Sequence, residues 1–265
     1  MIVYDLRTQP MAVGEFLSVM EMGAILGDDD IAFSYDPRDP TRGDPKLDHV
    51  TKDNFQRYFK PFLSLTHGKV VIDAGDYDWP TPEIRDKPLF HHLYNEVFTK
   101  QTKPLSFRSR AWADAFLLEH EAPYIIHLRL NPFFNNARRN SDYQTWLSFL
   151  KKRKERFVLI GEVMPEFRLD NTVIAKDYKT TTEQEMALVE AADVFLGPPS
   201  GPSSVAVFNR KPYRIFNATL RNDEVKSYRI NNGIGRFQWA TWNQKCMLGK
   251  ASVDQIEREF NKCLN

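Results

Sequence analysis

Apolar residues recur along the chain in short continuous runs and in runs with helical spacing, and the two kinds alternate. The continuous runs predict strands at 2–4, 31–35, 69–72, 124–130, 157–161, 173–175 and 194–196. Helical spacing predicts helices at 13–26, 55–65, 111–120, 143–149, 182–192 and 205–208. Strand, helix and strand in succession form the unit that builds a parallel sheet. The pattern therefore predicts an α/β protein.

The alternation occurs in both halves of the chain, and a break at 121–123 separates them. A chain of 265 residues is long enough for two domains of ordinary size. We expect two Rossmann-like lobes with parallel sheets, an N-terminal acceptor-side lobe at 1–121 and a C-terminal nucleotide-sugar-binding lobe at 122–265. Ligands of open parallel sheets bind beyond the carboxyl ends of the strands, so the lobes are expected to face a cleft.

Composition limits the kinds of partner. Hydrophobic residues make up 42% of the chain and charged residues 27%, which excludes wholesale disorder. Lys and Arg number 36 against 35 Asp and Glu, so no global positive field predicts nucleic-acid binding. Recognition of an anion must therefore be local.

The sequence also favours a cytoplasmic location. Its two cysteines, Cys246 and Cys263, are too few for a disulfide framework and are expected to be free thiols in a reducing compartment. The start MIVYDLRTQP lacks the apolar run of a signal peptide, and no stretch approaches the roughly 20 apolar residues that span a bilayer. Peripheral attachment to a membrane stays open.

The sharpest chemical feature is the stretch at 191–209, AADVFLGPPSGPSSVAVFN. After a predicted strand, Gly197 and Gly201 allow close approach of the backbone to a ligand, and Ser203 or Ser204 can cap a helix. The free N–H groups of a helix start favour an anion such as a diphosphate. A β-to-α turn that needs glycine and a cap for structural reasons alone explains the same residues equally well. Neither the P-loop pattern nor the dinucleotide GxGxxG occurs there.

The stretch ADVFLGPPSGPSSVAVFNRKPYRIF resembles the donor-side signature of GT-B glycosyltransferases, especially the heptosyltransferase-like families. In those families an Asp-Ser-Gly-Pro-like loop before a helix holds the nucleotide diphosphate. The resemblance implies that the donor is bound by Ser200, Gly201, Pro202, Ser203 and Ser204. This chain has Pro-Ser-Gly-Pro at 199–202 and lacks the aspartate.

A second stretch, IHLRLNPFFNNARRNSDYQTWLSFL, is similar to glycosyltransferases of surface-polysaccharide clusters. Arg129 follows a predicted buried strand, and Arg138, Arg139 and Asn140 lie in the loop before the next helix. Guanidinium groups bind phosphate oxygens through paired hydrogen bonds and neutralise the charge of a leaving nucleotide. For Arg138 and Arg139, a solvated loop with a helix cap at Asn140 or Ser141 is an equally good interpretation.

In the N-terminal half, VGEFL at 13–17 resembles the Gly-Asp-x-x-Leu segment after the first strand of heptosyltransferases, where the acid is the base toward the acceptor hydroxyl. The resemblance implies that role for Glu15, although its side chain is longer. Asp5 is a lesser catalytic candidate. A first-turn glutamate stabilised by the helix dipole explains Glu15 just as simply.

Several other clusters favour ordinary structural roles. Asp28, Asp29 and Asp30 follow a helix stop and predict a polar turn. The histidines lack the spacing and the cysteine company of a zinc site, so no metal is expected. The basic run KKRKER at 151–156 predicts a solvated helix end. Stacking on a sugar and packing in the core are both open to the aromatic group Phe237, Trp239 and Trp242, and the core is the expected place.

Together these features favour a glycosyltransferase that moves a sugar from a nucleotide-sugar substrate to a glycan or glycolipid acceptor in polysaccharide biosynthesis. We expect inversion at the sugar, no metal and no cofactor. Two alternatives remain open. The same scaffold serves sugar-nucleotide epimerases and hydrolases, and a degenerate lobe pair could bind a glycan or a partner protein without catalysis.

Overall fold

The chain folds into two compact units, 1–103 and 104–265. The computed structural model describes residues 2–4, 13–26, 31–33, 60–65, 70–72, 105–130, 139–163, 165–218, 228–231, 234–237 and 240–264. Each unit contains a parallel sheet and helices, so the predicted α/β class with two Rossmann-like lobes is confirmed. The cleft expected between the lobes stays a prediction.

The first unit contains a three-stranded parallel sheet in the order β1-β2-β3. Its described elements are β1 (Ile2–Tyr4), α1 (Val13–Leu26), β2 (Ile31–Phe33), the 3₁₀ helix η2 (Lys60–Leu65) and β3 (Val70–Ile72). Helix α1 joins two neighbouring parallel strands, and its apolar residues Phe16 and Leu17 are fully buried. The predicted strand-helix-strand beginning is therefore confirmed.

The second unit has an eight-stranded sheet in the order β6-β5-β4-β7-β8-β11-β10-β9. Its strands are β4 (Tyr124–His127), β5 (Phe157–Ile160), β6 (Thr172–Ile174), β7 (Val194–Gly197), β8 (Tyr213–Ala218), β9 (Tyr228–Asn231), β10 (Ile234–Phe237) and β11 (Gln244–Leu248). The six strands from β6 to β11 in this order are parallel, and β10 and β9 extend the sheet as an antiparallel hairpin.

The sheet reverses its direction of growth between β4 and β7. From β4 the chain adds β5 and then β6 on one side, and afterwards β7 and β8 on the other. This is the strand order of the doubly wound nucleotide-binding fold, in which ligands bind outside the carboxyl ends of the two strands at the reversal. The topology therefore predicts a ligand site at the loops that follow β4 and β7.

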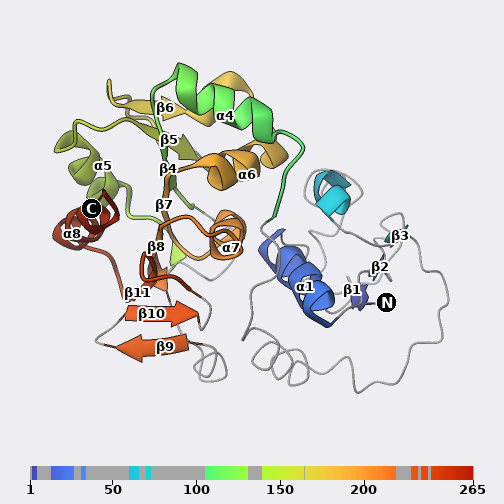
Figure 1. The fold of residues 1–265 in the computed structure, drawn as a ribbon. Coiled ribbons are helices and arrows are strands. Elements are labelled where there is room, and N and C mark those ends of the chain that lie inside the picture. The colour runs from blue at the N-terminus through green and yellow to red at the C-terminus, as the bar shows by residue number, and fades with distance from the viewer. Residues whose placement is uncertain are drawn as a thin grey trace, which may run out of the picture. The chain divides into compact units, whose positions relative to one another are not determined.

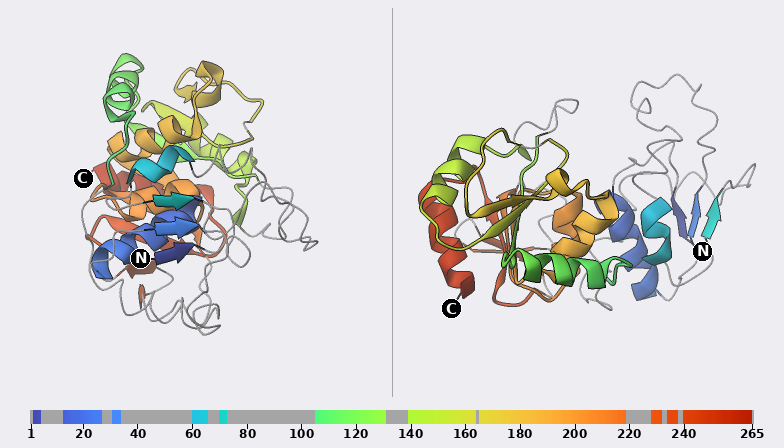
Figure 2. Two further views of the ribbon diagram at one scale, coloured as in Figure 1. Left: turned by 90° about the vertical axis from the view of Figure 1, so that its right-hand side faces the viewer. Right: turned by 90° about the horizontal axis from the view of Figure 1, so that it is seen from above.

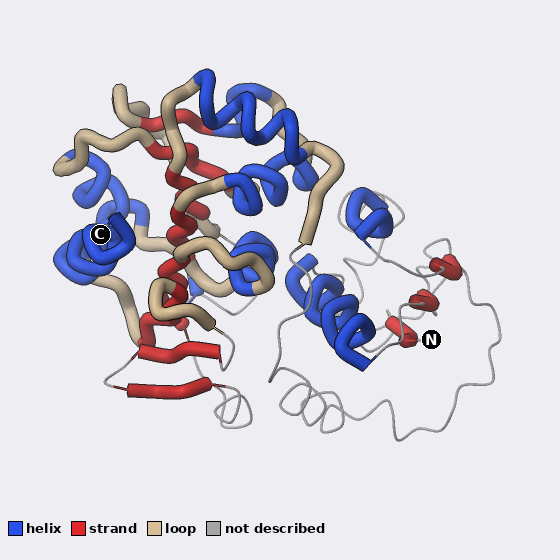
Figure 3. The backbone as a smooth tube through the Cα atoms, in the orientation of Figure 1, coloured by secondary structure: helices blue, strands red, loops and turns tan. Residues whose placement is uncertain are grey.

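Helices cover both faces of the second sheet (Figures 1 and 3). They are α4 (Arg110–Glu119), α5 (Tyr143–Lys151), η5 (Ala175–Tyr178), α6 (Thr182–Ala191), α7 (Gly201–Val207) and α8 (Val253–Leu264). Helices α5 and α8 lie on one face, and α6 and α7 lie on the other, as the view from above also shows (Figure 2). None of the described helices is long and apolar enough to cross a bilayer.

Aromatic rings from both layers fill the core between the sheet and helices α5 and α8. Phe149 of α5, Phe157 of β5 and Phe260 of α8 are fully buried, and their ring centroids lie 5.4–5.8 Å apart in pairs. Such aromatic pairs contribute about 0.5–1.5 kcal/mol beyond the area they bury. This face of the sheet is therefore rigidly packed and can support loops at its edge.

Helix α4 belongs to the second unit, although the boundary was expected at 121–122. The reason is its contact with α6. The backbone N–H of Phe107 donates to Glu190 Oε2 at 3.0 Å, and Arg110 Nη1 lies 3.2 Å from Glu190 Oε1. These polar contacts attach the segment before β4 to the second unit. The predicted break at 121–123 is the turn between α4 and β4.

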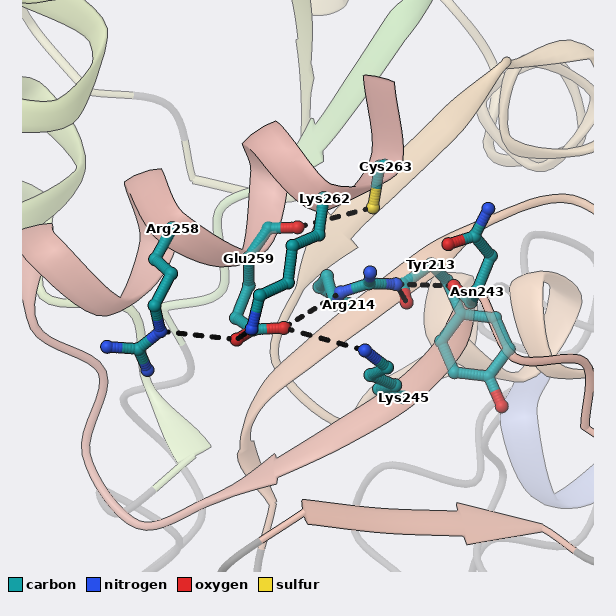
Figure 4. A network of polar contacts seen from close by, with 8 residues as sticks. All are labelled: Tyr213, Arg214, Asn243, Lys245, Arg258, Glu259, Lys262 and Cys263. Carbon is teal, nitrogen blue, oxygen red and sulfur yellow. Dashed lines mark hydrogen bonds and ion pairs between the residues drawn. The ribbon is translucent and has the colours of Figure 1, made fainter. Parts of the chain in front are cut away.

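A cluster of charges joins α8 to the amino ends of β8 and β11 (Figure 4). Glu259, almost fully buried, lies 3.4 Å from Arg214 Nε, 4.0 Å from Lys245 Nζ, 3.4 Å from Arg258 Nε and 2.8 Å from Lys262 Nζ. Burial alone would raise the pKa of the Glu259 carboxyl, but the hydrogen bond and charge of Lys262, with the other cations, lower it overall. Removing Glu259 would leave buried positive charge without compensation.

Two expectations about the C-terminal region differ from the structure. Helix α7 begins at Gly201 rather than Val205, because the Pro-Ser-Ser segment joins the helix as its first turn. Of the aromatic group, Phe237 is buried but Trp242 is 61% exposed, so the core role predicted for Trp242 is wrong. It lies in the turn before β11, and Trp239 is outside the described residues. The hairpin β9-β10 had no clear signal in the sequence.

The buried face of α1 includes a carboxyl group. Glu21 is 4% exposed, and its Oε1 has no hydrogen-bond partner among the described residues. Burial raises the pKa of Glu21 from 4.5 to about 7. A group whose folded-state pKa is raised contributes full stability below pH 4.5, and this contribution is lost as the pH rises through about 7.

Glu21→Gln is therefore expected to stabilise the protein at pH 8 by up to about 3 kcal/mol, since one pKa unit corresponds to about 1.4 kcal/mol. At pH 4.5 the gain should nearly disappear. Urea unfolding at both pH values measures the difference, with Glu119→Gln, an exposed helix position, as the matched control. The same change in stability at both pH values would contradict a buried, protonated Glu21.

Candidate functional site

The end of β4 carries two polar side chains in close succession. His127 is the last residue of the strand and is buried, and Arg129 follows two residues later. The strand is held in place by β5, since Leu128 N donates to Ile160 O at 3.0 Å beyond the last paired residues. Arg129 therefore emerges where the chain leaves the sheet.

The loop after β7 carries the serines of the predicted diphosphate site. Ser200 is the N-cap of α7, and its backbone N–H donates to Ser203 Oγ at 2.8 Å. Ser203 Oγ donates in turn to Ser200 O at 2.7 Å. Pro202 lies in the first turn, where its missing N–H removes no helical hydrogen bond. The loop is therefore fixed by its own polar groups.

The two loops are joined by a hydrogen bond between their strands' ends. Ser200 Oγ lies 2.9 Å from His127 Nδ1 and donates to Pro198 O at 3.1 Å. The close approach depends on Gly197: a Cβ there would lie 3.0 Å from His127 Cβ and 3.2 Å from its carbonyl oxygen. Glycine at 197 therefore avoids crowding against His127, whether or not a ligand binds nearby.

His127 serves as a neutral connector between the loops. Burial, and to a lesser extent the charge of Arg129, lowers the pKa of its imidazole to about 3. A base with so low a pKa accepts a proton from a serine hydroxyl poorly, so the Ser200–His127 pair is ill suited to nucleophilic catalysis. A neutral imidazole does, however, fix the direction of the Ser200 hydroxyl without adding charge.

Arg129 is held by the segment that begins α5. Its backbone N–H donates to Ser141 Oγ at 2.9 Å, and Ser141 N donates back to Arg129 O at 2.7 Å. Its guanidinium Nη1 donates to the side-chain oxygen Oδ1 of Asn140 at 2.6 Å. The predicted helix cap is neither Asn140 nor Ser141 but Asp142, which accepts from the amides of the first turn.

Positive charge is concentrated at this edge. Burial lowers the pKa of the Arg129 guanidinium, and the like charge of Arg139 lowers it further. Arg129 also acts on the pKa of His127, which contacts Ser200. The arrangement is suited to an anion, because an incoming negative charge would relieve the repulsion between the guanidiniums.

The structure brings most of the predicted donor-site residues to one edge of the second sheet. They follow β4 and β7 and comprise Arg129, Arg139, Asn140, Ser200, Gly201, Pro202, Ser203 and Ser204. Arg138 and Asp5 lie outside the described residues. Glu15 is in the first turn of α1, in the other unit.

The sequence did not predict the contact of His127 with Ser200, the closeness of Gly197 to His127, or the contact of Asn217 in β8 with Asn140. The available signal for His127 was its position at the end of an apolar run, two residues before Arg129. No local pattern predicts its neighbour across the sheet. Among the described residues there is no group of three or more His, Cys, Asp or Glu that could hold a metal ion.

An open cavity of about 350 Å³ lies elsewhere, beside α4 and the starts of β4 and β7. Its lining combines apolar and acidic side chains, namely Asp114, Leu117, Leu118, Glu121, Pro123, Ala191 and Asp193. Three carboxylates would repel a phosphate, so this cavity is unsuited to the ligand that the arginines favour.

No protein-family model and no curated protein sequence matches the chain. Two solved structures resemble it loosely. One is the E. coli heptosyltransferase WaaC with ADP-2-deoxy-2-fluoro heptose, at 12% identity and a TM-score of 0.36, over 91% of this chain and 75% of that one. The other is the glycosyltransferase SnogD from Streptomyces nogalater, at 12% identity and a TM-score of 0.30, over 80% and 63%. Likeness at these TM-scores carries no inference about activity.

Gly197→Ala is expected to destabilise the protein by about 1–3 kcal/mol, because the added methyl group would lie 3.0 Å from His127 Cβ and its neighbours must shift to make room. The hydrogen bond between Ser200 and His127 should lengthen as well. Urea unfolding gives the stability, and the His127 ring signals in NMR report the local change. Full stability with unchanged ring signals would show that the strands do not meet as described.

Proposed function

We propose that this protein is a glycosyltransferase that moves a sugar from a nucleotide-sugar donor to a glycan or glycolipid acceptor. The reaction is a single inverting displacement that needs no metal and no cofactor. One observation carries the proposal: side chains that can bind a diphosphate, led by Arg129 and Ser200, follow the carboxyl ends of the neighbouring strands β4 and β7, where the strand order reverses.

The site favours a nucleoside diphosphate over a dinucleotide. In dinucleotide-binding proteins a glycine-rich turn follows the first strand of the sheet, and the pyrophosphate lies at the start of the next helix. Here residues 128–142 contain no glycine. At the start of α5, Asp142 already accepts from Gln144 N and Thr145 N, at 3.1 and 3.4 Å. Its carboxylate would repel a second anion there.

Arginine is suited to the chemistry of the leaving group. In an inverting transfer the acceptor oxygen attacks the anomeric carbon while the bond from that carbon to the donor phosphate breaks. The electron pair passes to the phosphate oxygen, so negative charge grows on the diphosphate. Arg129 and Arg139 would stabilise that charge by hydrogen bonds and by proximity.

The acceptor hydroxyl must lose its proton as it attacks. We assign this proton to the carboxylate of Glu15, with Asp5 as the alternative base. The support is the sequence: VGEFL follows the first strand, and the helix it predicts is present as α1. Glycosyl transfer, as distinct from other uses of a nucleotide, likewise rests on the resemblance of the Gly-Pro-Ser segment and of the segment around Arg129.

A panel of nucleoside diphosphates (UDP, ADP, GDP, CDP and dTDP) tests the binding step by thermal shift. A ligand that binds the native state stabilises it by mass action, so one base should raise the melting temperature above the others. If none does so at millimolar concentration, the proposal fails. Incubating the matching nucleotide sugar without an acceptor then separates transfer from epimerisation or hydrolysis, since those two reactions still change the donor.

Arg129→Ala should weaken nucleoside diphosphate binding about tenfold or more, because a charged hydrogen bond to phosphate contributes roughly 1.5–3 kcal/mol. Calorimetric titration measures the dissociation constant. Arg108→Ala, at an exposed arginine of the same unit, is the matched control and should bind normally. A folded Arg129→Ala protein with unchanged affinity would exclude the assigned role.

Glu15→Gln should lower the transfer rate about 10²–10⁴-fold while leaving donor affinity almost unchanged, since the amide cannot accept the proton. A glutamate that merely stabilises the helix start would give normal turnover and a small loss of stability, about 0.3–1 kcal/mol. Transfer rate and donor affinity are measured side by side on the purified variant. Normal turnover would move the base to Asp5 or elsewhere.

A further inference from the structure

Asn217, near the carboxyl end of β8, has an unusual backbone conformation. Its φ is +57°, in the left-handed region that residues other than glycine rarely adopt, and it is 8% exposed. The pairing of β8 with β11 shifts register at this point, between Cys246 and Leu248. A strained conformation persists only where the surroundings hold it, and such residues gather at functional sites.

The Asn217 side chain bridges two other segments. Its Oδ1 accepts from the backbone N–H of Ala251 at 2.9 Å, in the connection between β11 and α8. Its Nδ2 donates to the backbone oxygen of Asn140 at 3.2 Å, in the segment before α5. Both ends of the amide are therefore used, and the left-handed backbone sets the direction of the side chain.

The bridge continues to the candidate site through Asn140. While its backbone oxygen accepts from Asn217, its side-chain oxygen accepts from Arg129 Nη1 at 2.6 Å. A second tie supports the same segment, because Lys250 Nζ lies 3.2 Å from Asp142 Oδ2. Residues 140–142 are thus attached at two points to the connection that precedes α8.

We propose that Asn217 is a positioning residue: through Asn140 it orients the Arg129 guanidinium for binding an anion. The proposal rests on the proposed function in so far as Arg129 binds a diphosphate. A long arginine side chain loses conformational freedom when it binds a phosphate, and a guanidinium fixed beforehand loses less. Asn217 would therefore raise affinity for the anion without touching it.

Two variants separate the side chain from the backbone. Asn217→Gly keeps the left-handed conformation and removes both hydrogen bonds. Asn217→Asp also tolerates positive φ and keeps an acceptor for Ala251 N, but it cannot donate to Asn140. Asn171→Gly is the structural control, because Asn171 Nδ2 also donates to backbone oxygens, of Leu150 at 3.0 Å and Arg153 at 3.1 Å, beside the start of β6.

The test is a double-mutant cycle with inorganic pyrophosphate as the probe, titrated into the full chain by calorimetry. Asn217→Gly and Asn217→Asp should each weaken binding about three- to tenfold, whereas Asn171→Gly should not. In the Arg129→Ala background the Asn217 substitutions should cause no further loss beyond about twofold, because coupled residues are not additive. Additive losses, or unchanged affinity in folded Asn217 variants, would overturn the proposal.

A measurement without ligand keeps this inference separate from the proposed function. The Arg129 Nε–H signal in NMR should exchange with solvent several-fold faster in Asn217→Gly than in the wild type. Unchanged exchange would overturn the positioning role even if nucleotides bind. Faster exchange in a protein that binds neither pyrophosphate nor any nucleoside diphosphate would support the positioning of Arg129 and would defeat the proposed function alone.

Discussion

Where β4 and β7 end side by side, a glycine without a side chain allows His127 to approach within van der Waals distance. The reversal of strand order falls between these two strands, so the chain leaves them toward opposite sides of the sheet. The loops that diverge from this point carry Arg129 and Ser200. His127 connects them because its buried, neutral imidazole contacts one and lies near the charge of the other. A side chain at 197 would crowd His127, and its neighbours would have to shift by a few tenths of an ångström.

Two arginines of the second unit lie in different environments: Arg214 is fully buried, whereas Arg129 is only partly buried. Arg214, at the amino end of β8, lies 3.4 Å from the carboxylate of Glu259 and joins α8 to the sheet. Arg129, at the carboxyl edge, contacts the amide oxygen of Asn140, and a second guanidinium acts on its pKa. The charge of Arg214, compensated by Glu259, serves packing. At Arg129 the neighbouring like charge of Arg139 favours the approach of an anion. Arginine thus stabilises the amino edge of the sheet through Arg214 and provides a candidate anion-binding group at the carboxyl edge through Arg129.

The polar network at the carboxyl edge also links the site to α8. Asn217 and Lys250 reach the segment that holds Arg129, and both lie close in sequence to the ends of the strands that pack on α8. The aromatic core beneath α8 is tightly packed, so the network has a rigid base. A loop site that is supported in this way can be preorganised without being buried.

The sequence by itself determined the alternation of strands and helices, because apolar runs and helical spacing are local and follow from burial on two faces or one. It also determined that arginines and serines follow the strands at 124–127 and 194–197, since these residues are adjacent to the runs. It did not determine that His127 meets Ser200, that Gly197 is required by a neighbour 70 residues away in sequence, or that Asn217 reaches Asn140. Those facts depend on strand order and register, which join residues distant along the chain, and only the tertiary structure decides them.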